Sequence, residues 1–287
     1  MQNNYHHTVI VPAFILLSSV SGVANAQYST SATPPPKSEW TPLDSGRFGQ
    51  ELTEKWIPVP NGDSGAPRQG WLNTADGFFT REAHLAYDYT DARTDRHQIL
   101  ARFNYPLSRR FWVGIEAPFY QESRGRGDFG DITVSTLVML KETKNLSLNA
   151  GVGWRLPTGT VALGNAQFSP TPQLNVWSDI GRGFSLRGRV GYQIADRGQS
   201  DAVIVNATLG QTFTPHSRAP LGDLTWYVAV NWNQPTVRAA PTFVSITPGA
   251  RTHLGGNLFL LAGVEVPVTN ARAFFRERFI VQLVQGF

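Results

Sequence analysis

From residue 78 onward, apolar and polar residues alternate in segments of about ten residues, with turn-forming residues between the segments. Side chains of a β-strand point in turn to opposite faces, so a period of two predicts strands with one apolar and one polar face. The clearest segment covers residues 111–119, where every second residue is apolar, and residues 243–250 form the poorest one. The chain is therefore predicted to be all-β, with about twelve antiparallel strands, an even number.

The last segment ends the chain on an aromatic residue, Phe287. Gln285 interrupts its apolar parity, and its polar parity carries Ile280 and Val284 beside two arginines. It resembles the closing strand of a bacterial outer-membrane β-barrel, in which the terminal aromatic residue belongs to the signal read by the assembly machinery. In a closed barrel this strand would pair with the first strand, near residues 83–89.

Two folds are compatible with the alternation. In a soluble sandwich the apolar faces fill a core and the polar faces meet water. In a transmembrane barrel the apolar faces meet lipid and the polar faces line a lumen. Aromatic residues near strand ends, such as Tyr89, Trp154 and Trp232, favour the barrel because such barrels carry aromatic girdles. We also find no predicted helix that could cover the edges of an open sheet.

The predicted connections alternate in length, as in outer-membrane barrels with short periplasmic turns and longer outer loops. With the C-terminus in the periplasm, the turns fall at residues 106–110, 142–145, 181–183, 214–222 and 251–256. The outer loops then fall at residues 90–96, 121–130, 157–170, 195–201, 233–241 and 268–274. We therefore predict an antiparallel up-and-down β-barrel of the bacterial outer membrane, formed by residues 76–287.

The N-terminal residues are predicted to be a secretory signal peptide, residues 1–26, cleaved after Ala26. The apolar run is too short, and too interrupted by Pro12, to favour a membrane anchor. Residues 27–75 are rich in proline, glycine and small polar residues and read as an irregular segment. Its tryptophans suggest that part of it docks, so it is either a periplasmic tether or a plug in the lumen.

Composition excludes several classes of site. The chain has no cysteine, which removes disulfides, thiolate metal sites and cysteine nucleophiles. The net charge is +4, but the basic residues are scattered among acids, which argues against nucleic acid as a partner. No phosphate loop, zinc-binding helix motif or dinucleotide fingerprint is present, so we expect no cofactor.

Two short motifs carry a family resemblance. Residues 127–132 read Gly-Asp-Phe-Gly-Asp-Ile at the start of a strand, and residues 156–159 read Leu-Pro-Thr-Gly at the end of the next. Together they resemble an outer-membrane family linked to the meta-pathway of phenol degradation, whose members are labelled transporters. The resemblance covers residues 78–287. It implies an outer-membrane barrel and, more loosely, small aromatic or apolar substrates, and it carries over no catalytic residue.

Charged residues on the polar parity are the candidate functional residues of the lumen. Opposed rows of charge could select solutes by sign and shape, or the charges could pair across the lumen and fill it. Ionisable groups at membrane depth are functional candidates by default. The candidates are Glu82, Arg102, Glu116, Arg155, Asp179, Arg187, Arg189, Glu265, Arg276 and Arg278.

Catalytic and metal sites are not expected. Asp128, Asp131 and Glu122 are too few for a divalent-ion site and lack a calcium-loop register, so turn and strand-start roles are favoured. An outer-membrane lipase is the rival class, because a serine nucleophile needs a histidine base within reach. His216 and Ser217 lie in a predicted periplasmic turn, and the chain shows no His-x-Ser arrangement of the outer-membrane phospholipase kind. We expect no enzyme.

These observations predict an outer-membrane channel for passive passage of small solutes, including hydrophobic or aromatic compounds. Its expected partners are outer-membrane lipid, the barrel-assembly machinery and a small-molecule permeant. The alternative is a non-conducting barrel with a structural or surface-interaction role, its lumen blocked by side chains or by residues 27–75.

Overall fold

The computed structural model describes residues 39–122, 125, 127–161, 166–196, 200–237, 240–269 and 274–287. The predicted signal peptide, with its cleavage site, and residues 27–38 of the irregular segment lie outside these ranges. Among the described residues, no helix is both long enough and apolar enough to cross a membrane.

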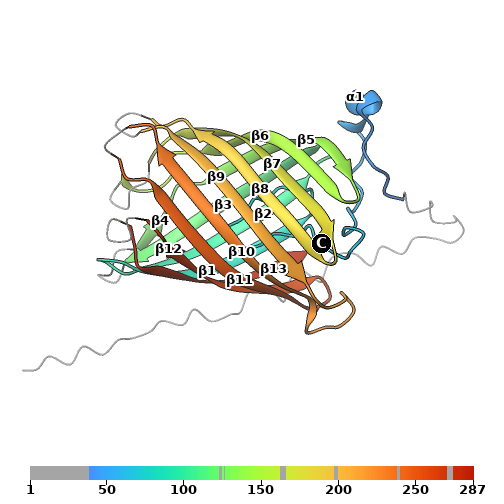
Figure 1. The fold of residues 1–287 in the computed structure, drawn as a ribbon. Helices are drawn as coiled ribbons and strands as arrows, with labels where there is room; N and C mark the ends of the chain where they lie inside the picture. The colour runs from blue at the N-terminus through green and yellow to red at the C-terminus, as the bar shows by residue number, and fades with distance from the viewer. Residues whose placement is uncertain are drawn as a thin grey trace, which may run out of the picture. The chain divides into compact units, whose positions relative to one another are not determined.

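In the described part of the chain, twelve long antiparallel strands form a single closed sheet, and a three-residue strand, β4 (Gly127–Phe129), pairs only with β3 (Figure 1). The long strands are β1 (Glu82–Asp91), β2 (Arg96–Pro106), β3 (Phe111–Glu122), β5 (Thr133–Thr143), β6 (Leu146–Arg155), β7 (Ser169–Gly181), β8 (Phe184–Gln193), β9 (Ala202–Thr212), β10 (Gly222–Pro235), β11 (Phe243–Gly255), β12 (Leu258–Pro267) and β13 (Glu277–Gly286). The predicted fold class is confirmed.

The barrel closes between the first and last strands, as the sequence predicted. β1 pairs with β13 over ten residue pairs, from Glu82 opposite Gly286 to Asp91 opposite Glu277. On the outer surface of this seam, the ring of Phe287 stacks on Phe103 with centroids 5.4 Å apart. Closure supplies each of the twelve long strands with two neighbours, so none of these described strands is left as an open edge of the sheet.

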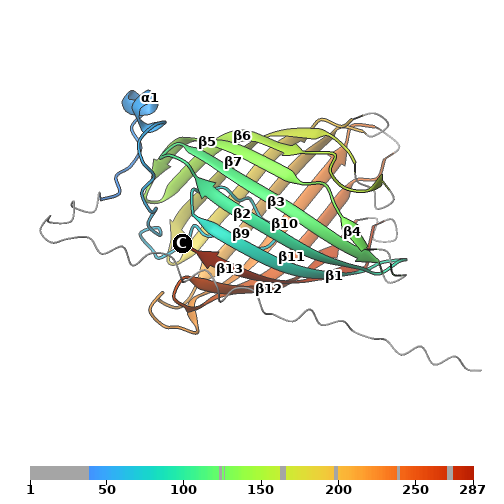
Figure 2. The same cartoon turned by 180° about the vertical axis from the view of Figure 1, so that it is seen from behind.

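Most connections alternate in length as predicted; the exceptions are the long β9–β10 connection, residues 213–221, and the short β1–β2 connection, residues 92–95. Short turns join β2 to β3, β5 to β6, β7 to β8 and β11 to β12, and they share one end of the barrel with the C-terminus (Figure 2). We call this the turn end and the opposite one the loop end. The β7–β8 turn needs glycine at residue 183: its φ is +75°, and an added Cβ would lie 2.4 Å from the carbonyl oxygen of Thr212.

The two faces of the sheet are inverted relative to a soluble protein. Outward-facing Leu85 and Trp226 are 37% and 62% exposed, whereas inward-facing Glu82 and Asn104 are fully buried. An apolar exterior around a polar interior is stable when lipid, not water, surrounds the barrel. The structure thereby decides between the two folds that the alternation left open.

β11 is longer than its weak pattern indicated. The poorest predicted segment covered residues 243–250, but the strand continues to Gly255. Its outward face includes Thr252 and Pro248, which blurs the alternation. Hydrogen bonding to β10 and β12 on both sides holds the strand despite this composition.

Candidate functional site: the charged lumen and its inner segment

The lumen contains part of the chain itself. Residues 39–81 include a 3-10 turn, η1 (Ser45–Arg47), and one helical turn, α1 (Phe48–Glu51), followed by irregular backbone. Residues 62–79, here called the inner segment, are bonded to lumen-facing side chains of different strands. The backbone N–H of Leu72 donates to the hydroxyl of Tyr227 on β10 (3.0 Å), that of Ala75 donates to Asn206 on β9 (2.8 Å), and Asn149 on β6 donates to the carbonyl of Gly77 (3.0 Å).

Apolar side chains at lumen positions pack against the inner segment. Trp71 stacks on Tyr227 with centroids 4.9 Å apart, and the same buried cluster contains Ile280 and Val284 of β13. The two residues that broke the alternation of the last strand are therefore covered by the inner segment. In a second cluster, Phe79 packs against Trp112, Leu137 and Met139. In a third, Phe78, Ala66 and Ala75 pack against Trp177.

Glycine at position 210 makes room for this packing. The residue faces the lumen on β9, and an added Cβ would lie 2.6 Å from the ring of Trp71. A side chain there would push the tryptophan away from the wall.

An arginine of the inner segment is its principal charged anchor. The side chain of Arg68 is fully buried and pairs with Glu142 at the end of β5, with 3.0 Å between Nη1 and Oε1. Its guanidinium also lies 4.6 Å from the centroid of the Trp177 ring. The positive charge of Arg68 is thus neutralised by a carboxylate that is also buried. Removing either residue would leave the other as an uncompensated buried charge.

Three candidate residues lie beneath the inner segment. Arg187 is fully buried and donates to the carbonyl of Pro67 (2.9 Å), while Glu82 lies 2.9 Å from His84 Nε2. Asp179 accepts the backbone N–H of Ser64 at 2.8 Å. These side chains hold backbone or neighbouring side chains and do not face open space.

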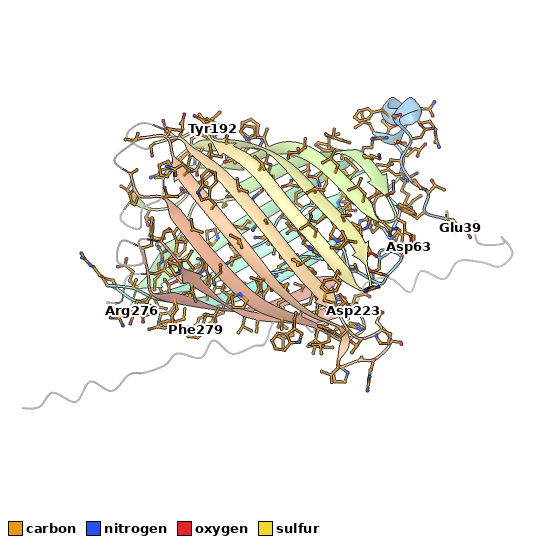
Figure 3. All side chains as sticks on the ribbon, in the orientation of Figure 1. Glu39, Asp63, Tyr192, Asp223, Arg276 and Phe279 are labelled. Carbon is orange, nitrogen blue, oxygen red and sulfur yellow. The ribbon has the colours of Figure 1, made fainter. Side chains whose placement is uncertain are left out.

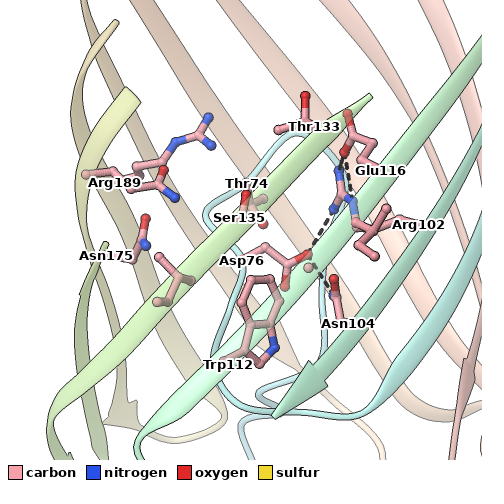
Figure 4. A pocket seen from close by; sticks show the side chains of 14 residues that line it. Thr74, Asp76, Arg102, Asn104, Trp112, Glu116, Thr133, Ser135, Asn175 and Arg189 are labelled. Atoms are coloured by element: carbon pink, nitrogen blue, oxygen red, sulfur yellow. Dashed lines mark hydrogen bonds and ion pairs between the residues drawn. The ribbon is translucent and has the colours of Figure 1, made fainter. Parts of the chain in front are cut away.

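Four candidates form ion pairs around the inner segment. Arg102 bridges Asp76 and Glu116, at 2.9 Å from an oxygen of each (Figure 4). Arg278 pairs with Glu265, and Asn73 of the inner segment contacts both of them. Both pairs join directly opposite residues on neighbouring strands, so these charges pair along the wall and through the inner segment rather than across the lumen.

Three arginines lie nearer the loop end. Arg155 Nε is 2.8 Å from Asp131 Oδ2. Arg189 faces two adjoining cavities of the lumen. Arg276 has the lumen parity but precedes β13, and its side chain is 83% exposed at the loop end, at the opposite end of the barrel from Asp223 (Figure 3). The prediction that Arg276 lines the lumen is wrong, because the strand that would turn its side chain inward has not begun.

Asp131 clamps an outer loop. It accepts the backbone N–H groups of Gly159 (2.9 Å), Ala166 (2.8 Å) and Gln167 (3.2 Å). Burial acts to raise the pKa of Asp131, but these N–H groups and Arg155 outweigh it and hold that pKa below its usual range. Among the described residues, no group of acids and histidines could hold a metal ion. The family motif at residues 127–132 thus supplies a loop anchor.

We expect Asp131→Asn to weaken the attachment of the outer loop at residues 159, 166 and 167 by about 1.5–3 kcal/mol, the range for a hydrogen bond to a charged group. Because the folded pKa is lowered, the carboxylate stabilises the loop above the ordinary value of about 3.9 and the effect is lost as pH falls through the folded pKa. Proteolysis of this loop in the detergent-solubilised barrel should be faster in the variant at pH 7. Equal rates at pH 7 would contradict the clamp, and Asp128→Asn, which alters an exposed neighbour, is the control.

The sequence did not predict which residues of the inner segment contribute to the site. Arg68, Asp76 and Trp71 were not among the candidates, and Trp177 was not assigned to the lumen. Two signals were present in the sequence. The tryptophans of residues 27–75 indicated that part of this segment docks, and the apolar residues on the polar parity of β13 mark positions that something must cover.

Comparisons with known proteins place this chain in a family. A family model described as "Putative MetA-pathway of phenol degradation" matches residues 60–282. The chain belongs to this family. The match begins before the first strand of the barrel, so it covers the inner segment as well as most of the barrel strands.

Solved structures share the fold. The COG4313 outer membrane channel from Pseudomonas putida F1 is 14% identical, with a TM-score of 0.54 over 76% of this chain and 99% of that one. The KdgM porin (12% identical, TM-score 0.52) and the NanC porin (9%, 0.51) each match 72% of this chain and 99% of their own. No curated protein matches the sequence significantly. The fold is thus that of outer-membrane channels and porins, which supports an outer-membrane location.

Proposed function

We propose that this family member is an outer-membrane channel through which small solutes pass down their gradients. One observation carries the proposal: an apolar exterior encloses a lumen lined by charged and polar side chains, with cavities toward the loop end. Charged linings let polar solutes replace part of their hydration shell inside a membrane. The family description, together with the apolar Trp112 and Leu137 in the lining of the smaller cavity, supports small aromatic compounds as permeants.

The inner segment favours a closed resting state. Its contacts reach strands all around the wall, from Asp76 with Arg102 on β2 to Asn73 with Arg278 on β13. A non-conducting barrel remains the second candidate because the same contacts could be permanent. The two candidates differ in whether the inner segment ever leaves its position.

Planar bilayer recording of the full chain tests the proposal. We expect discrete, low-conductance openings that become more frequent when the inner segment is weakened, and faster entry of phenol into liposomes that contain the protein. Complete absence of conductance, both in the full chain and in a chain without the inner segment, would refute the channel and leave the structural barrel.

A further inference from the structure

A cavity of about 200 Å³ lies in the wall of the lumen toward the loop end. Its lining comes from the loop-end halves of β5, β6, β7, β8 and β9, which contribute mainly hydroxyl and amide side chains. It adjoins a second cavity of about 170 Å³, shown in Figure 4, and Arg189 and Ser135 line both. Pockets for drug-sized ligands are about 300–1,000 Å³, so the larger cavity suits a small molecule.

The charges of the larger cavity all have one sign. Among the described residues that line it, only Arg155 and Arg189 are charged. Arg155 is already bonded to Asp131. Arg189 makes no hydrogen bond or ion pair with any residue that the structure describes, and its Nε is buried without a partner.

No carboxylate that the structure describes is bonded to Arg189; Asp76 and Glu116 act on its charge only from across the smaller cavity. The partners of Arg189 in the ladder are Asn175 on β7 and Asn206 on β9, both uncharged. Across the smaller cavity, Asp76 and Glu116 are held by Arg102 (Figure 4). Arg189 is half-buried, and its guanidinium has a buried Nε and no bonded carboxylate, so a ligand in the cavity could supply the counter-charge.

We propose that this cavity binds a small organic carboxylate, with Arg189 as the residue that recognises the charge. The planar fork of a guanidinium matches the two oxygens of a carboxylate. Ser135 and Thr171 are positioned to add hydroxyl contacts, and Ile204 gives the cavity an apolar side for the body of the ligand. This inference rests on the proposed function. In a channel, the cavity is a binding site along the path that permeating solutes take.

Binding to the full-length protein in detergent tests the site by isothermal titration calorimetry with benzoate as the probe. We expect saturable binding of benzoate, at least tenfold weaker binding of the uncharged isostere benzamide, and at least tenfold weaker benzoate binding by Arg189→Gln. Arg189→Lys should recover part of the affinity, because it restores the charge without the fork. Arg276→Gln, at the exposed loop-end arginine, is the matched control and should bind like the unaltered protein.

Three outcomes would overturn the site: equal binding of benzoate and benzamide, unchanged benzoate binding by Arg189→Gln, or competition by chloride at concentrations equal to benzoate. The last would make the cavity a general anion site. Because Arg189 has no ion pair to lose, Arg189→Gln should unfold no more readily than the unaltered protein, and thermal unfolding checks this. Conductance without benzoate binding refutes the site alone, whereas binding without conductance refutes the channel alone.

Discussion

A chain that lacks residues 39–79 is expected to conduct several-fold more current per opening than the full chain, because deletion removes the material that fills the turn-end half of the lumen. The residues deleted include Trp71 and Phe79, whose rings are buried against opposite parts of the wall. Once they are gone, water and ions reach lumen positions that are fully covered in the structure, such as Arg187. Single-channel recording in planar bilayers measures the change.

The barrel itself should survive this deletion. Every long strand keeps both neighbours, and closure through β1 and β13 does not involve the deleted residues. The cost is exposure of apolar lumen side chains such as Ile280 and Val284, at about 25 cal/mol for each Å² returned to water. Arg187, in turn, regains hydration.

A shorter deletion is the matched control. Removing residues 39–50 takes away η1, most of α1, and the packing of Trp40 near Arg68 and of Leu43 near Phe79, but leaves the hydrogen bonds and ion pairs of residues 62–79 with the strands. This chain should conduct like the full one. If the chain without residues 39–79 also conducts like the full chain, the inner segment does not limit the current and the closed state must have another cause.

Replacing Arg68 by alanine should release the inner segment more strongly than any other single change to it. The substitution leaves Glu142, whose side chain is 3% exposed, as a buried carboxylate without its guanidinium. Breaking a buried pair in this way costs about 3–5 kcal/mol. Loss of packing on Trp177 adds to the effect. We expect limited proteolysis between residues 60 and 75 of the folded barrel to accelerate strongly, and channel openings to become more frequent.

The control uses a pair that joins the same two parts of the chain at the surface. Lys144 contacts Asp63 at 2.7 Å, but both side chains are more than half exposed. Such pairs contribute about 0–1 kcal/mol, so Lys144→Ala should barely change proteolysis. Adding Glu142→Gln to Arg68→Ala should restore part of the docking, because it removes the uncompensated charge. If Arg68→Ala is no more sensitive to proteolysis than Lys144→Ala, the buried pair does not hold the segment.

Much of the lumen could be predicted from parity. A period of two fixes which side chains share a face, so Glu82, Arg102 and Glu265 were assigned correctly to the interior wall. Parity fails where a strand has not begun, as at Arg276. It also says nothing of partners: Arg187 was considered a candidate for ion selectivity, yet it holds the carbonyl of Pro67, 120 residues away in the chain.

The sequence by itself determined the strands, their number and faces, the alternation of turns and loops, and the pairing of the last strand with the first. These follow from local alternation and from the need to pair every strand edge in lipid. Only the tertiary structure decided which part of the lumen is covered and which cavity stays open beside Arg189. The inner segment has no periodic pattern, and its contacts join residues more than 100 positions apart, such as Pro67 and Trp177. Ile280 and Val284 showed in the sequence that something covers them, but only the folded chain identifies Trp71 and Leu72 as the covering residues.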